Sequence, residues 1–560
     1  MNRWFGRIQI RDAKPVVETT DSTMTTSDRN DRTRRLLARL LGERSADMAL
    51  THFRGARVRL SASPATLSTP NGMLAFATAA NMLTRFVGDL VLVTGALEDR
   101  EVSELERLLE GLRRVDSTPG KKLAIEIGAP KAHDGHRLHI GESETLKVRG
   151  EGTLFVSFDA WQAAIHRSCP LGPITASRVP FGGLIAACLA VAEVFKTLVC
   201  EAVPSESMQR KFSARLVQSY RYSAWYADRV DVFSRNELAD PPDDLPRIEL
   251  NGFLQVGAGA VGNATALAIR SAPGLCGQLP LLDPKEVDAK SLNRCLFFTE
   301  LDVGESKAQI VAARASRALL QIRGEQRTFV SSDGERTRVL ISTVDNNDVR
   351  HMMQESLPRW IVQGSTSATS VAVSVHSATD GRSCLICRHP DRQHGVTRVV
   401  PLSITQAAAK LGVSEDVIQQ NRFANTAEIS NDFIQTLTGL DPDVVSFFEN
   451  ARSLGHDLCG AIGDFRSRFG IPNGPQEPSI PFASAFAGFQ AAAEVVKLGL
   501  VEAGVENVPV LENVLEIDLG FDYARHRTPA FREPPRTDCS LCQVRRREVS
   551  VLYSKKWSGD

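Results

Sequence analysis

The sequence predicts an α/β protein in which two related units, each built on a mostly parallel sheet, follow one another in a single chain. Strand-like apolar runs alternate with helical patterns in the first third of the chain, which is typical of α/β folds. A seventeen-residue pattern recurs 301 positions further on. A glycine-rich loop also joins a strand to a helix in the second unit, as in nucleotide-binding folds.

Length and composition are those of an ordinary globular protein. The 560 residues suffice for three or so domains at roughly 100–200 residues each. Because 66 basic residues balance 66 acidic ones, we expect neither nucleic acid nor an anionic membrane as a partner. The N-terminus shows no export signal, and the longest apolar run, over 181–192, is too short to span a bilayer. We therefore expect a soluble cytoplasmic protein.

The elements of the first unit can be read in order. Residues 1–28 are polar and are expected to form a flexible N-terminus, followed by a basic helix over 29–42. Apolar runs predict strands at 90–93, 123–127 and 154–158, and a helical pattern covers 104–115.

The recurring pattern relates this first unit to a second one. The stretch PFGGLIAACLAVAEVFK begins at Pro180, PFASAFAGFQAAAEVVK begins at Pro481, and eight of the seventeen positions are identical. Chance is the simpler explanation, because apolar helices look alike. However, each stretch follows a strand that runs into an aspartate, Asp159 or Asp345. We therefore infer two copies of one unit, over about 30–205 and 220–525, the second lengthened by an insertion.

The second copy contains a nucleotide-binding pattern. Residues 252–256 are predicted as a buried strand and 263–270 as a helix, with a GxGxxG loop between them. The pattern alone suits NAD, FAD and ATP equally. Asp283 follows the next strand, where a ribose hydroxyl would lie. The glycines of the loop are Gly257, Gly259 and Gly262.

Cations further along favour a triphosphate over a dinucleotide. Arg294 and Lys307 follow Asp283. Dehydrogenases have no need for these two cations. In a site for a nucleotide triphosphate, Arg294 and Lys307 would neutralise the β- and γ-phosphates while the α-phosphate is attacked. Asp345, at the end of a later strand, would face the ligand crevice and could hold Mg²⁺. Each residue alone is more often a surface charge, but their order together favours a nucleotide site.

In this order the motifs resemble the adenylating domain of the ubiquitin-activating (E1) enzymes and of their bacterial relatives in thiamin and molybdopterin synthesis. The family pattern is GxGxxG, an Asp, Asn-Leu-x-Arg-Gln, a Lys and a later Asp; here Ser291 replaces the Asn and Cys295 the Gln. The resemblance implies binding of ATP and Mg²⁺, with Arg294, Lys307 and Asp345 also taking part in catalysis. The implied nucleotide-binding residues are Gly257, Gly259, Gly262, Asp283, Asn293, Arg294, Lys307 and Asp345.

The first copy lacks these motifs, since its corresponding loop reads VTGAL at 93–97. The resemblance therefore implies a pseudo-dimer of two Rossmann-like, ThiF-type adenylation units, the N-terminal one inactive and the C-terminal one active. In the family, an arginine near the partner's N-terminus reaches the ATP. Arg29 and Arg32 are the candidates here, and a basic solvated helix is the alternative.

Four of the ten cysteines form two Cys-x-x-Cys pairs. In a reducing compartment such pairs indicate metal ligands or redox centres. They match the zinc knuckle of the family, which implies one closed, structural Zn²⁺ site made of four thiolates. A dithiol redox centre is the alternative, although nothing thioredoxin-like surrounds either pair. The ligands would be Cys384, Cys387, Cys539 and Cys542.

The insertion, over 392–478, has helical patterns and contains a single cysteine, Cys459. Its place in the chain is that of the family's catalytic-cysteine domain, which implies that Cys459 attacks the acyl-adenylate and carries a thioester. His456 could help to deprotonate Cys459 or could be an ordinary surface histidine. A buried helix cysteine is the alternative for Cys459, and Cys295 is the rival nucleophile.

The resemblance thus implies an ATP-dependent activating enzyme that adenylates a ubiquitin-like protein and passes it from its own cysteine to an E2-like partner. The Arg-rich, compact chain suits the bacterial versions, which belong to conjugation operons associated with phage defence. The alternatives are an adenylyltransferase for sulfur transfer or peptide maturation without a thioester, and an inactive scaffold. A pseudo-dimer needs no second copy but does not forbid one.

The expected domains are 1–28 (flexible), 29–215 (inactive), 216–391 with 479–545 (active, with the zinc site), 392–478 (catalytic cysteine) and 546–560 (tail).

Overall fold

The computed structural model describes most of the chain outside the insertion. The described residues are 26–41, 43–116, 120–128, 135–141, 152–167, 177–203, 206–229, 241–377, 381–389, 434, 445, 448–449, 479–520, 530–537 and 539–557. They belong to two compact units, of which the first comprises 1–34, 48–389 and 479–560 and the second 35–47 and 390–478. Cys459 lies outside the described residues, and of the helical patterns predicted in the insertion only 434, 445, 448 and 449 are described, each of them helical. The structural description below concerns the first unit and the helices α1 and α2, parts of which belong to the second.

The N-terminal part of the described chain contains one sheet and the helices around it. The helices are α1 (Thr26–Leu41), α2 (Glu43–Gly55), α3 (Pro64–Ser68), α4 (Pro70–Thr84), α5 (Asp99–Val115), α6 (Phe181–Ala202) and α7 (Glu206–Ser213). The strands are β1 (Arg57–Ala62), β2 (Asp89–Thr94), β3 (Lys122–Ile127), β4 (His136–Ile140), β5 (Thr153–Phe158), β6 (Gln162–Arg167), β7 (Ser219–Ser223) and β8 (Asp228–Arg229).

The C-terminal part contains a second sheet. Its strands are β9 (Ile248–Glu249), β10 (Phe253–Val256), β11 (Leu275–Leu282), β12 (Leu320–Glu325), β13 (Val339–Ser342), β14 (Trp360–Ser367), β15 (Ser370–His376), β16 (Val514–Asp518) and β17 (Ala530–Phe531). The α-helices are α8 (Ala260–Ser271), α9 (Lys307–Ala315), α10 (Ser331–Gly334), α11 (Asn347–Glu355), α12 (Leu385–Arg388), α18 (Pro481–Glu502) and α19 (Arg546–Trp557). Short turns are η2 (Ala289–Ser291), η3 (Glu300–Asp302) and the π-helical η4 (Ser540–Val544).

The two sheets have the same strand order and the same strand directions. The first runs β3-β2-β1-β4-β5-β6-β7-β8 and the second β12-β11-β10-β13-β14-β15-β16-β17, with β9 beside β11. In each sheet the first five strands in this order are parallel and the last three antiparallel. The α/β prediction is therefore confirmed, but both sheets are mixed.

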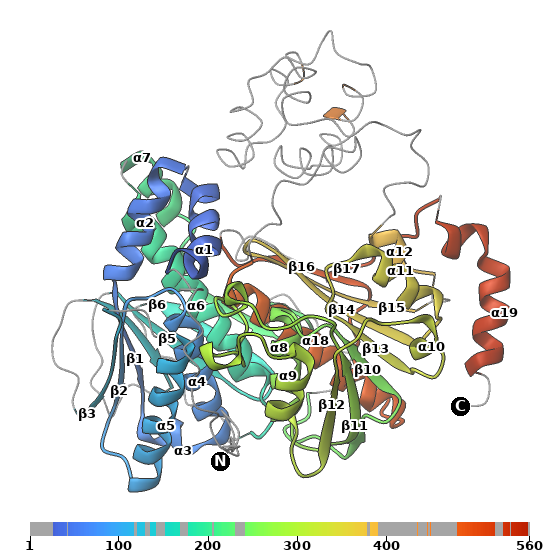
Figure 1. The fold of residues 1–560 in the computed structure, drawn as a ribbon, viewed down its shortest axis with the longest axis horizontal. Helices are drawn as coiled ribbons and strands as arrows, with labels where there is room; N and C mark the ends of the chain where they lie inside the picture. The colour runs from blue at the N-terminus through green and yellow to red at the C-terminus, as the bar shows by residue number, and fades with distance from the viewer. Residues whose placement is uncertain are drawn as a thin grey trace. The chain divides into compact units, whose positions relative to one another are not determined.

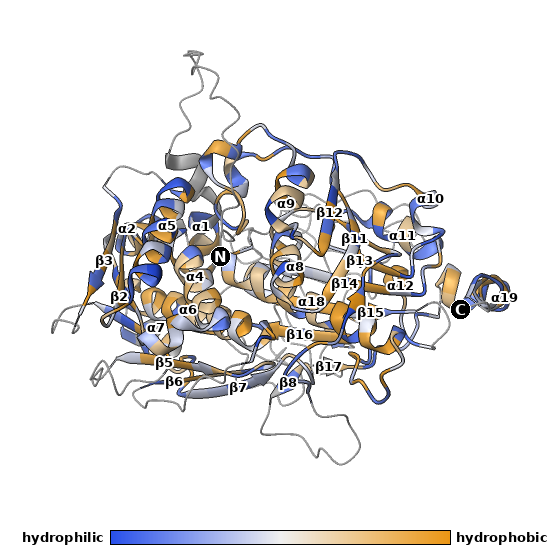
Figure 2. Cartoon of the chain, turned by 90° about the horizontal axis from the view of Figure 1, so that it is seen from below, coloured by the Kyte–Doolittle hydropathy of each residue, from blue (hydrophilic) through white to orange (hydrophobic). Residues whose placement is uncertain are grey.

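Helices α6 and α18 begin at the two Pro-Phe positions and pack against each other between the sheets (Figure 1). The rings of Phe195 and Phe482 lie 5.5 Å apart, and the Tyr222 hydroxyl donates to Gln490 Oε1 at 3.0 Å. Both helices are long and apolar enough to cross a membrane, but 94% of the apolar window of each is buried inside the protein. In Figure 2 the helices α6, α8 and α18 are mostly pale to orange, the colours of intermediate to hydrophobic residues, as expected for core helices.

Each central helix carries a buried Glu–Lys ion pair. In α6, Lys196 contacts Glu193, and neither side chain is more than 1% exposed. Glu193 Oε2 accepts from the amide of Val217 at 3.1 Å, and Lys196 Nζ donates to the carbonyl of Arg215 at 3.0 Å. The pair therefore attaches the segment that leads into β7 to the helix. Backbone hydrogen bonds stabilise the two charges in addition to their attraction for each other.

Helix α18 has the same arrangement three hundred positions later. Lys497 Nζ lies 2.6 Å from Glu494 Oε1, with both side chains fully buried. Glu494 Oε2 accepts from the amide of Leu511 at 2.9 Å, and Lys497 donates to the carbonyl of Pro509 at 2.8 Å. Burial raises the pKa of Glu494 and lowers that of Lys497, so that attraction between the partners is what sustains both charges. This pair fixes the segment that leads into β16.

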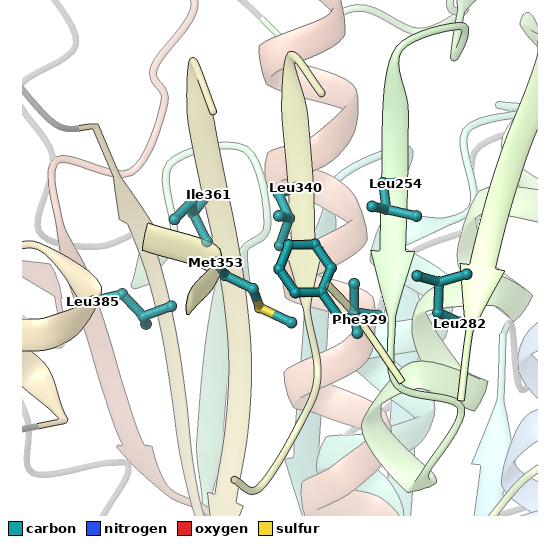
Figure 3. Close-up of a cluster of buried hydrophobic side chains, with 8 residues drawn as sticks. Leu254, Leu282, Phe329, Leu340, Met353, Ile361 and Leu385 are labelled. Atoms are coloured by element: carbon teal, nitrogen blue, oxygen red, sulfur yellow. The ribbon is translucent and has the colours of Figure 1, made fainter. Parts of the chain in front are cut away.

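The opposite face of the second sheet is covered by an apolar cluster that positions two functional segments (Figure 3). Met353 reaches the sheet from α11 and Leu385 from α12. Because α11 follows Asp345 and α12 carries Cys387, packing of these helices places both segments against the sheet. The strand residues of the cluster are Leu254, Val256, Leu282, Leu340 and Ile361, and Phe329 joins them from a loop.

Replacing Lys497 by methionine is expected to lower the free energy of unfolding by about 3–5 kcal/mol, because Glu494 would remain buried without its partner. Urea unfolding monitored by circular dichroism would measure the change. Lys555→Met, at an exposed position of α19, is the control and should leave the unfolding midpoint unchanged. Equal stability of Lys497→Met and the wild type would show that the pair does not hold α18 to β16.

Candidate functional site

The glycine loop lies between β10 and α8, and its three glycines serve different purposes. Gly257 has φ 102°, and a Cβ there would lie 2.7 Å from Thr343 Oγ1. A Cβ on Gly262 would lie 2.2 Å from the carbonyl oxygen of Gly257. A Cβ on Gly259, at the N-cap of α8, would meet no atom of the described residues within 4 Å, its chain neighbours aside. Two glycines are therefore required by the loop's own conformation, whereas Gly259 keeps the end of the helix open to a ligand.

Buried polar side chains hold the carbonyl groups of this loop. Gln255, in the middle of β10, donates from Nε2 to two loop carbonyls at 3.1 and 3.0 Å. Asn263 donates to two others at 2.8 and 3.1 Å, and Thr343 Oγ1 donates to the carbonyl of Gly257 at 2.9 Å. The sequence analysis missed all three residues. A glutamine inside an otherwise apolar strand was the one signal that could have indicated such a role.

The first N–H groups of α8 are available to an anion. The N-terminal amides of a helix have no partner within the helix, and no side chain caps this one. The positive end of the helix dipole adds to the attraction for negative charge. The glycine loop and α8 together can therefore bind a phosphate group.

Asp283 lies beside the glycine loop and is only 7% exposed. Its Oδ2 accepts from the amide of Ala258 at 2.7 Å, and its Oδ1 accepts from the amide of Lys285 at 2.8 Å. In this structure the carboxylate therefore fixes the loop. Each carboxylate oxygen can accept a second hydrogen bond, so the two amide contacts leave room for a ribose hydroxyl. The predicted ribose contact stays a prediction.

Lys307 is brought next to the Asp283 loop by backbone pairing. Its amide donates to the carbonyl of Lys285 at 3.1 Å, and Val287 N donates to Glu305 O at 2.8 Å. The Lys307 side chain is 7% exposed, yet the described part of the chain offers its Nζ neither an ion pair nor a hydrogen bond. The charge of Lys307 acts on Asp288, but no carboxylate of the described residues forms an ion pair with Nζ, so a ligand can still meet this ammonium group. The position of Lys307 thus suits an anionic ligand.

An acidic residue that the sequence analysis did not single out, Asp288, organises the segment before Arg294. Asp288 Oδ1 accepts from the amide and the hydroxyl of Ser291, at 2.6 and 2.5 Å. Although desolvation opposes the effect, the Ser291 hydroxyl and the charges of Lys307 and Arg294 lower the pKa of Asp288. The structure therefore brings Arg294 and Lys307 into one electrostatic neighbourhood. The partly exposed Arg294 makes one long contact, to the carbonyl of Lys290 at 3.4 Å.

Asn293 points away from solvent. It is 3% exposed, and its Nδ2 donates to Thr33 Oγ1 of α1 at 3.0 Å. Its Oδ1 is buried, and no described residue forms a hydrogen bond with it. Its predicted contact with nucleotide stays a prediction. Arg29 and Arg32 lie on the same helix α1, but their side chains lie outside the described part.

Asp345 lies in the loop that joins β13 to α11 and is exposed. This loop begins at Thr343, whose hydroxyl donates to the carbonyl of Gly257. The predicted Mg²⁺ ligand therefore lies two residues after a direct contact with the glycine loop. The loop is held by Arg350, whose Nη2 donates to the carbonyl of Val344 at 2.6 Å. Burial lowers the pKa of Arg350 to about 10, against the opposing effect of Asp345. No hydrogen bond or ion pair from the described residues occupies the Asp345 carboxylate, which leaves it available to a cation.

The two Cys-x-x-Cys pairs come together, and their four sulfur atoms all lie within 4.8 Å of one another. Sγ of Cys384 lies 3.7 Å from that of Cys387 and 3.7 Å from that of Cys539, and Cys387 lies 3.8 Å from Cys542. A tetrahedral ion with metal–sulfur bonds of about 2.3 Å has sulfur–sulfur edges of about 3.8 Å. The spacing therefore fits one tetrahedral ion, and the sulfur atoms are too far apart for disulfide bonds.

The four thiols interact through hydrogen bonds among themselves, which raise the pKa of Cys384 and of Cys542 and lower the pKa of Cys387 and of Cys539. A hydrogen bond from Cys384 lowers the pKa of Cys387 to about 7, and the amide of Arg536 donates to Cys387 Sγ at 3.4 Å. Hydrogen bonds from the other three thiols lower the pKa of Cys539 well below its ordinary value. The cluster connects α12 to the C-terminal segment, where Val549 and Tyr553 of α19 pack against it.

Cys295, the rival nucleophile, is a poor candidate for thioester chemistry. It is 1% exposed, and burial raises the pKa of its thiol although Arg294 and Lys307 oppose that shift. A buried, protonated thiol is not nucleophilic. Cys459 is not among the described residues, so its role stays a prediction.

Comparisons with known proteins identify both parts of the chain. A family described as "ThiF family" matches residues 235–541, more than half of the chain, and one described as "BilD N-terminal domain" matches residues 57–216. The chain is also similar to an uncharacterized protein, y4jF, of Sinorhizobium fredii, with 26% identity over 368 residues. That similarity covers 62% of this chain and 64% of the relative's length. The two family matches confirm the resemblance inferred from the motifs, to E1-like proteins of the Bil type.

The glycine loop predicts opposite behaviour for two alanine substitutions. Gly257→Ala is expected to cost about 1–3 kcal/mol of folding free energy, because φ is positive and Thr343 lies too close. Gly259→Ala meets open space and is expected to leave the midpoint of urea unfolding unchanged. Equal destabilisation by the two substitutions would contradict the different purposes given to these glycines.

Proposed function

Because this chain belongs to the ThiF family, we propose that it is an E1-like activating enzyme for a ubiquitin-like protein. It would use ATP to adenylate the C-terminus of that protein, form a thioester on its own cysteine and pass the modifier to an E2-like protein. The observation that carries the proposal is an uncapped helix N-terminus together with Lys307, a mostly buried residue whose ammonium group forms no ion pair or hydrogen bond with the described residues. These two features are complementary to a polyphosphate.

In the first step, a carboxylate oxygen of the modifier's C-terminus attacks the α-phosphorus of ATP. The bond to the bridging oxygen breaks, and pyrophosphate leaves with the electron pair. Arg294 and Lys307 would neutralise the β- and γ-phosphates as charge develops on the leaving group. The glycine loop and the N-terminus of α8 would hold phosphate oxygens, and Asp345 would hold the Mg²⁺, which supplies further charge neutralisation when bound.

In the second step, the Cys459 thiolate attacks the acyl carbon of the adenylate, and AMP leaves. The thiolate of an E2-like protein then attacks the thioester carbon, the bond from that carbon to the Cys459 sulfur breaks, and Cys459 leaves as its thiolate. Support for Cys459 comes from its position in the insertion and from the buried, protonated state of Cys295. A bacterial antiphage system is the proposed setting, supported by the BilD-type match.

We also assign a structural Zn²⁺ to Cys384, Cys387, Cys539 and Cys542, on the sulfur–sulfur spacing described above. All four tetrahedral positions would be taken by thiolates, leaving none for a reactant. Zinc would therefore join α12 to the C-terminal segment and take no part in the chemistry.

The domain organisation that we propose keeps the boundaries expected from the sequence, with an inactive unit over 29–215 and an active unit over 216–391 and 479–545. The identical strand orders and the equivalent Glu–Lys pairs of α6 and α18 support a duplicated unit. The loop at 93–97 that the sequence suggested as the counterpart of the glycine loop follows β2, which corresponds to β11. The equivalent loop follows β1, the counterpart of β10, and its Ser63-Pro64 has no GxGxxG pattern. The assembly would then be a pseudo-dimer within one chain.

ATP–pyrophosphate exchange in the presence of a candidate modifier tests the first step. Lys307→Met is expected to lower the exchange rate by about 100-fold or more, because charge on the leaving pyrophosphate loses its partner. Lys285→Met, at an exposed position two residues after Asp283, is the matched control and should behave like the wild type. Exchange by Lys307→Met at the wild-type rate would refute the proposed phosphate site.

Non-reducing gels of the same reaction test the second step. The wild type and Cys295→Ala should form a modifier adduct that dithiothreitol removes, and Cys459→Ala should not. An adduct that persists in Cys459→Ala would contradict the assignment of the nucleophile. Adenylate formation without any adduct would favour a ThiF-type adenylyltransferase for sulfur transfer or peptide maturation.

Elemental analysis of the purified protein tests the metal. We expect about one zinc ion per chain, as for a closed four-thiolate site. Cys542→Ser should lose most of the zinc and unfold at a lower temperature, whereas Cys276→Ser, a buried cysteine outside the cluster, should keep it. Wild-type protein free of zinc but with reversible Cys-x-x-Cys disulfides would instead indicate the redox alternative.

A further inference from the structure

Helix α4, in the part of the chain without nucleotide motifs, ends against the loop that carries Arg294. Arg85, the C-cap of α4, is 4% exposed. Its guanidinium donates from Nη1 to the carbonyl of Leu292, and from Nη2 to that of Leu296 at 3.4 Å. One side chain therefore holds the residues on both sides of Arg294.

Asn81, one turn earlier on α4 and fully buried, sets the orientation of Arg85. Asn81 Oδ1 accepts from Nε and Nη2 of Arg85 at 3.0 and 2.9 Å. Its Nδ2 donates to the carbonyl of Leu296 at 3.2 Å. The two side chains form one hydrogen-bonded network, so the guanidinium has little freedom to leave the loop.

A third contact from the N-terminal part reaches the same loop. Thr33 of α1 accepts from Asn293 at 3.0 Å. Thr33, Asn81 and Arg85 thus contact the loop over residues 292–296. Within the described part of the chain, the long contact to Lys290 is all that fixes the Arg294 side chain, so its position depends on the backbone that carries it.

From these contacts we propose that Asn81 and Arg85 are positioning residues, which hold the 292–296 backbone so that Arg294 meets the nucleotide phosphates. The N-terminal part then contributes to adenylation without binding nucleotide through a glycine loop of its own. The inference rests on the proposed function, because it assigns a ligand to Arg294. A small displacement of a charge-stabilising group is sufficient to slow a reaction. Asn81 and Arg85 can therefore affect the rate of adenylation without contacting the nucleotide.

Hydrogen–deuterium exchange on the full-length protein without nucleotide tests the positioning directly. In Arg85→Met, the amides of Cys295 and Phe298 are expected to exchange at least tenfold faster, because their bonds to Ser291 and Cys295 lie in the loop that is released. Arg59→Met is the matched control: Arg59 is 5% exposed, lies on β1 and pairs with Glu126. It should leave exchange in the loop unchanged.

ATP–pyrophosphate exchange supplies the functional measurement. Arg85→Met is expected to lower kcat/KM for ATP by about 10- to 100-fold, with Arg59→Met within twofold of the wild type. Arg85→Lys, which keeps the charge and one donor, should recover part of the loss. Thr33→Val conserves side-chain volume and provides a second test if Arg85→Met folds poorly. This variant should also speed hydrogen–deuterium exchange in the 292–296 loop.

Loop exchange unchanged in both Arg85→Met and Thr33→Val would overturn the inference. An equal loss of kcat/KM in Arg59→Met would overturn it too, since the effect would then reflect general destabilisation. A wild-type protein without ATP–pyrophosphate exchange would refute the proposed function alone, because the hydrogen–deuterium measurement still decides whether Asn81 and Arg85 hold the loop.

Discussion

The packing of α6 against α18 is the constraint on which the rest of this structure depends. Helix α4 packs against α6, and α8 packs against α18. Once the two central helices are joined, the C-terminal end of α4 and the N-terminal end of α8 have fixed positions. One end presents Arg85 to the loop around Arg294, and the other presents free amides behind the glycine loop. Apolar burial, which carries no chemical specificity, thereby sets the geometry of a charged site.

Two lysines of the second sheet's helices show how charge is used differently in core and site. Lys497 and Lys307 are both largely or fully buried, but Lys497 has Glu494 at 2.6 Å and two backbone carbonyls. Around Lys307 the described residues supply no such partner. A charge inside the core has to be neutralised by the protein itself, whereas the Lys307 ammonium group can be met by an anionic ligand. The contrast distinguishes a structural cation from one whose position suits a ligand.

The sequence predicted those features of the fold and site that depend on local spacing. The strand–GxGxxG–helix pattern, the two Cys-x-x-Cys pairs and the Pro-Phe helices were all found, because each is written in a few adjacent residues. The residues that hold the site were missed. Asn81 and Arg85 lie more than two hundred positions before the loop that they contact, so no local pattern could indicate them. Asp283 was found, but its bond to the Ala258 amide became apparent only in three dimensions.

The cysteine cluster has a topological consequence. Cys384 and Cys539 lie 155 positions apart, and the whole insertion falls between them. A metal ion at the cluster would close the chain from Cys384 to Cys539 into a ring that contains the insertion together with α18, β16 and β17. The cost of closing such a ring grows only with the logarithm of its length. A protein of this design could therefore gain or lose residues inside the ring over evolutionary time, while the two ends of the ring stay joined at the cysteine cluster.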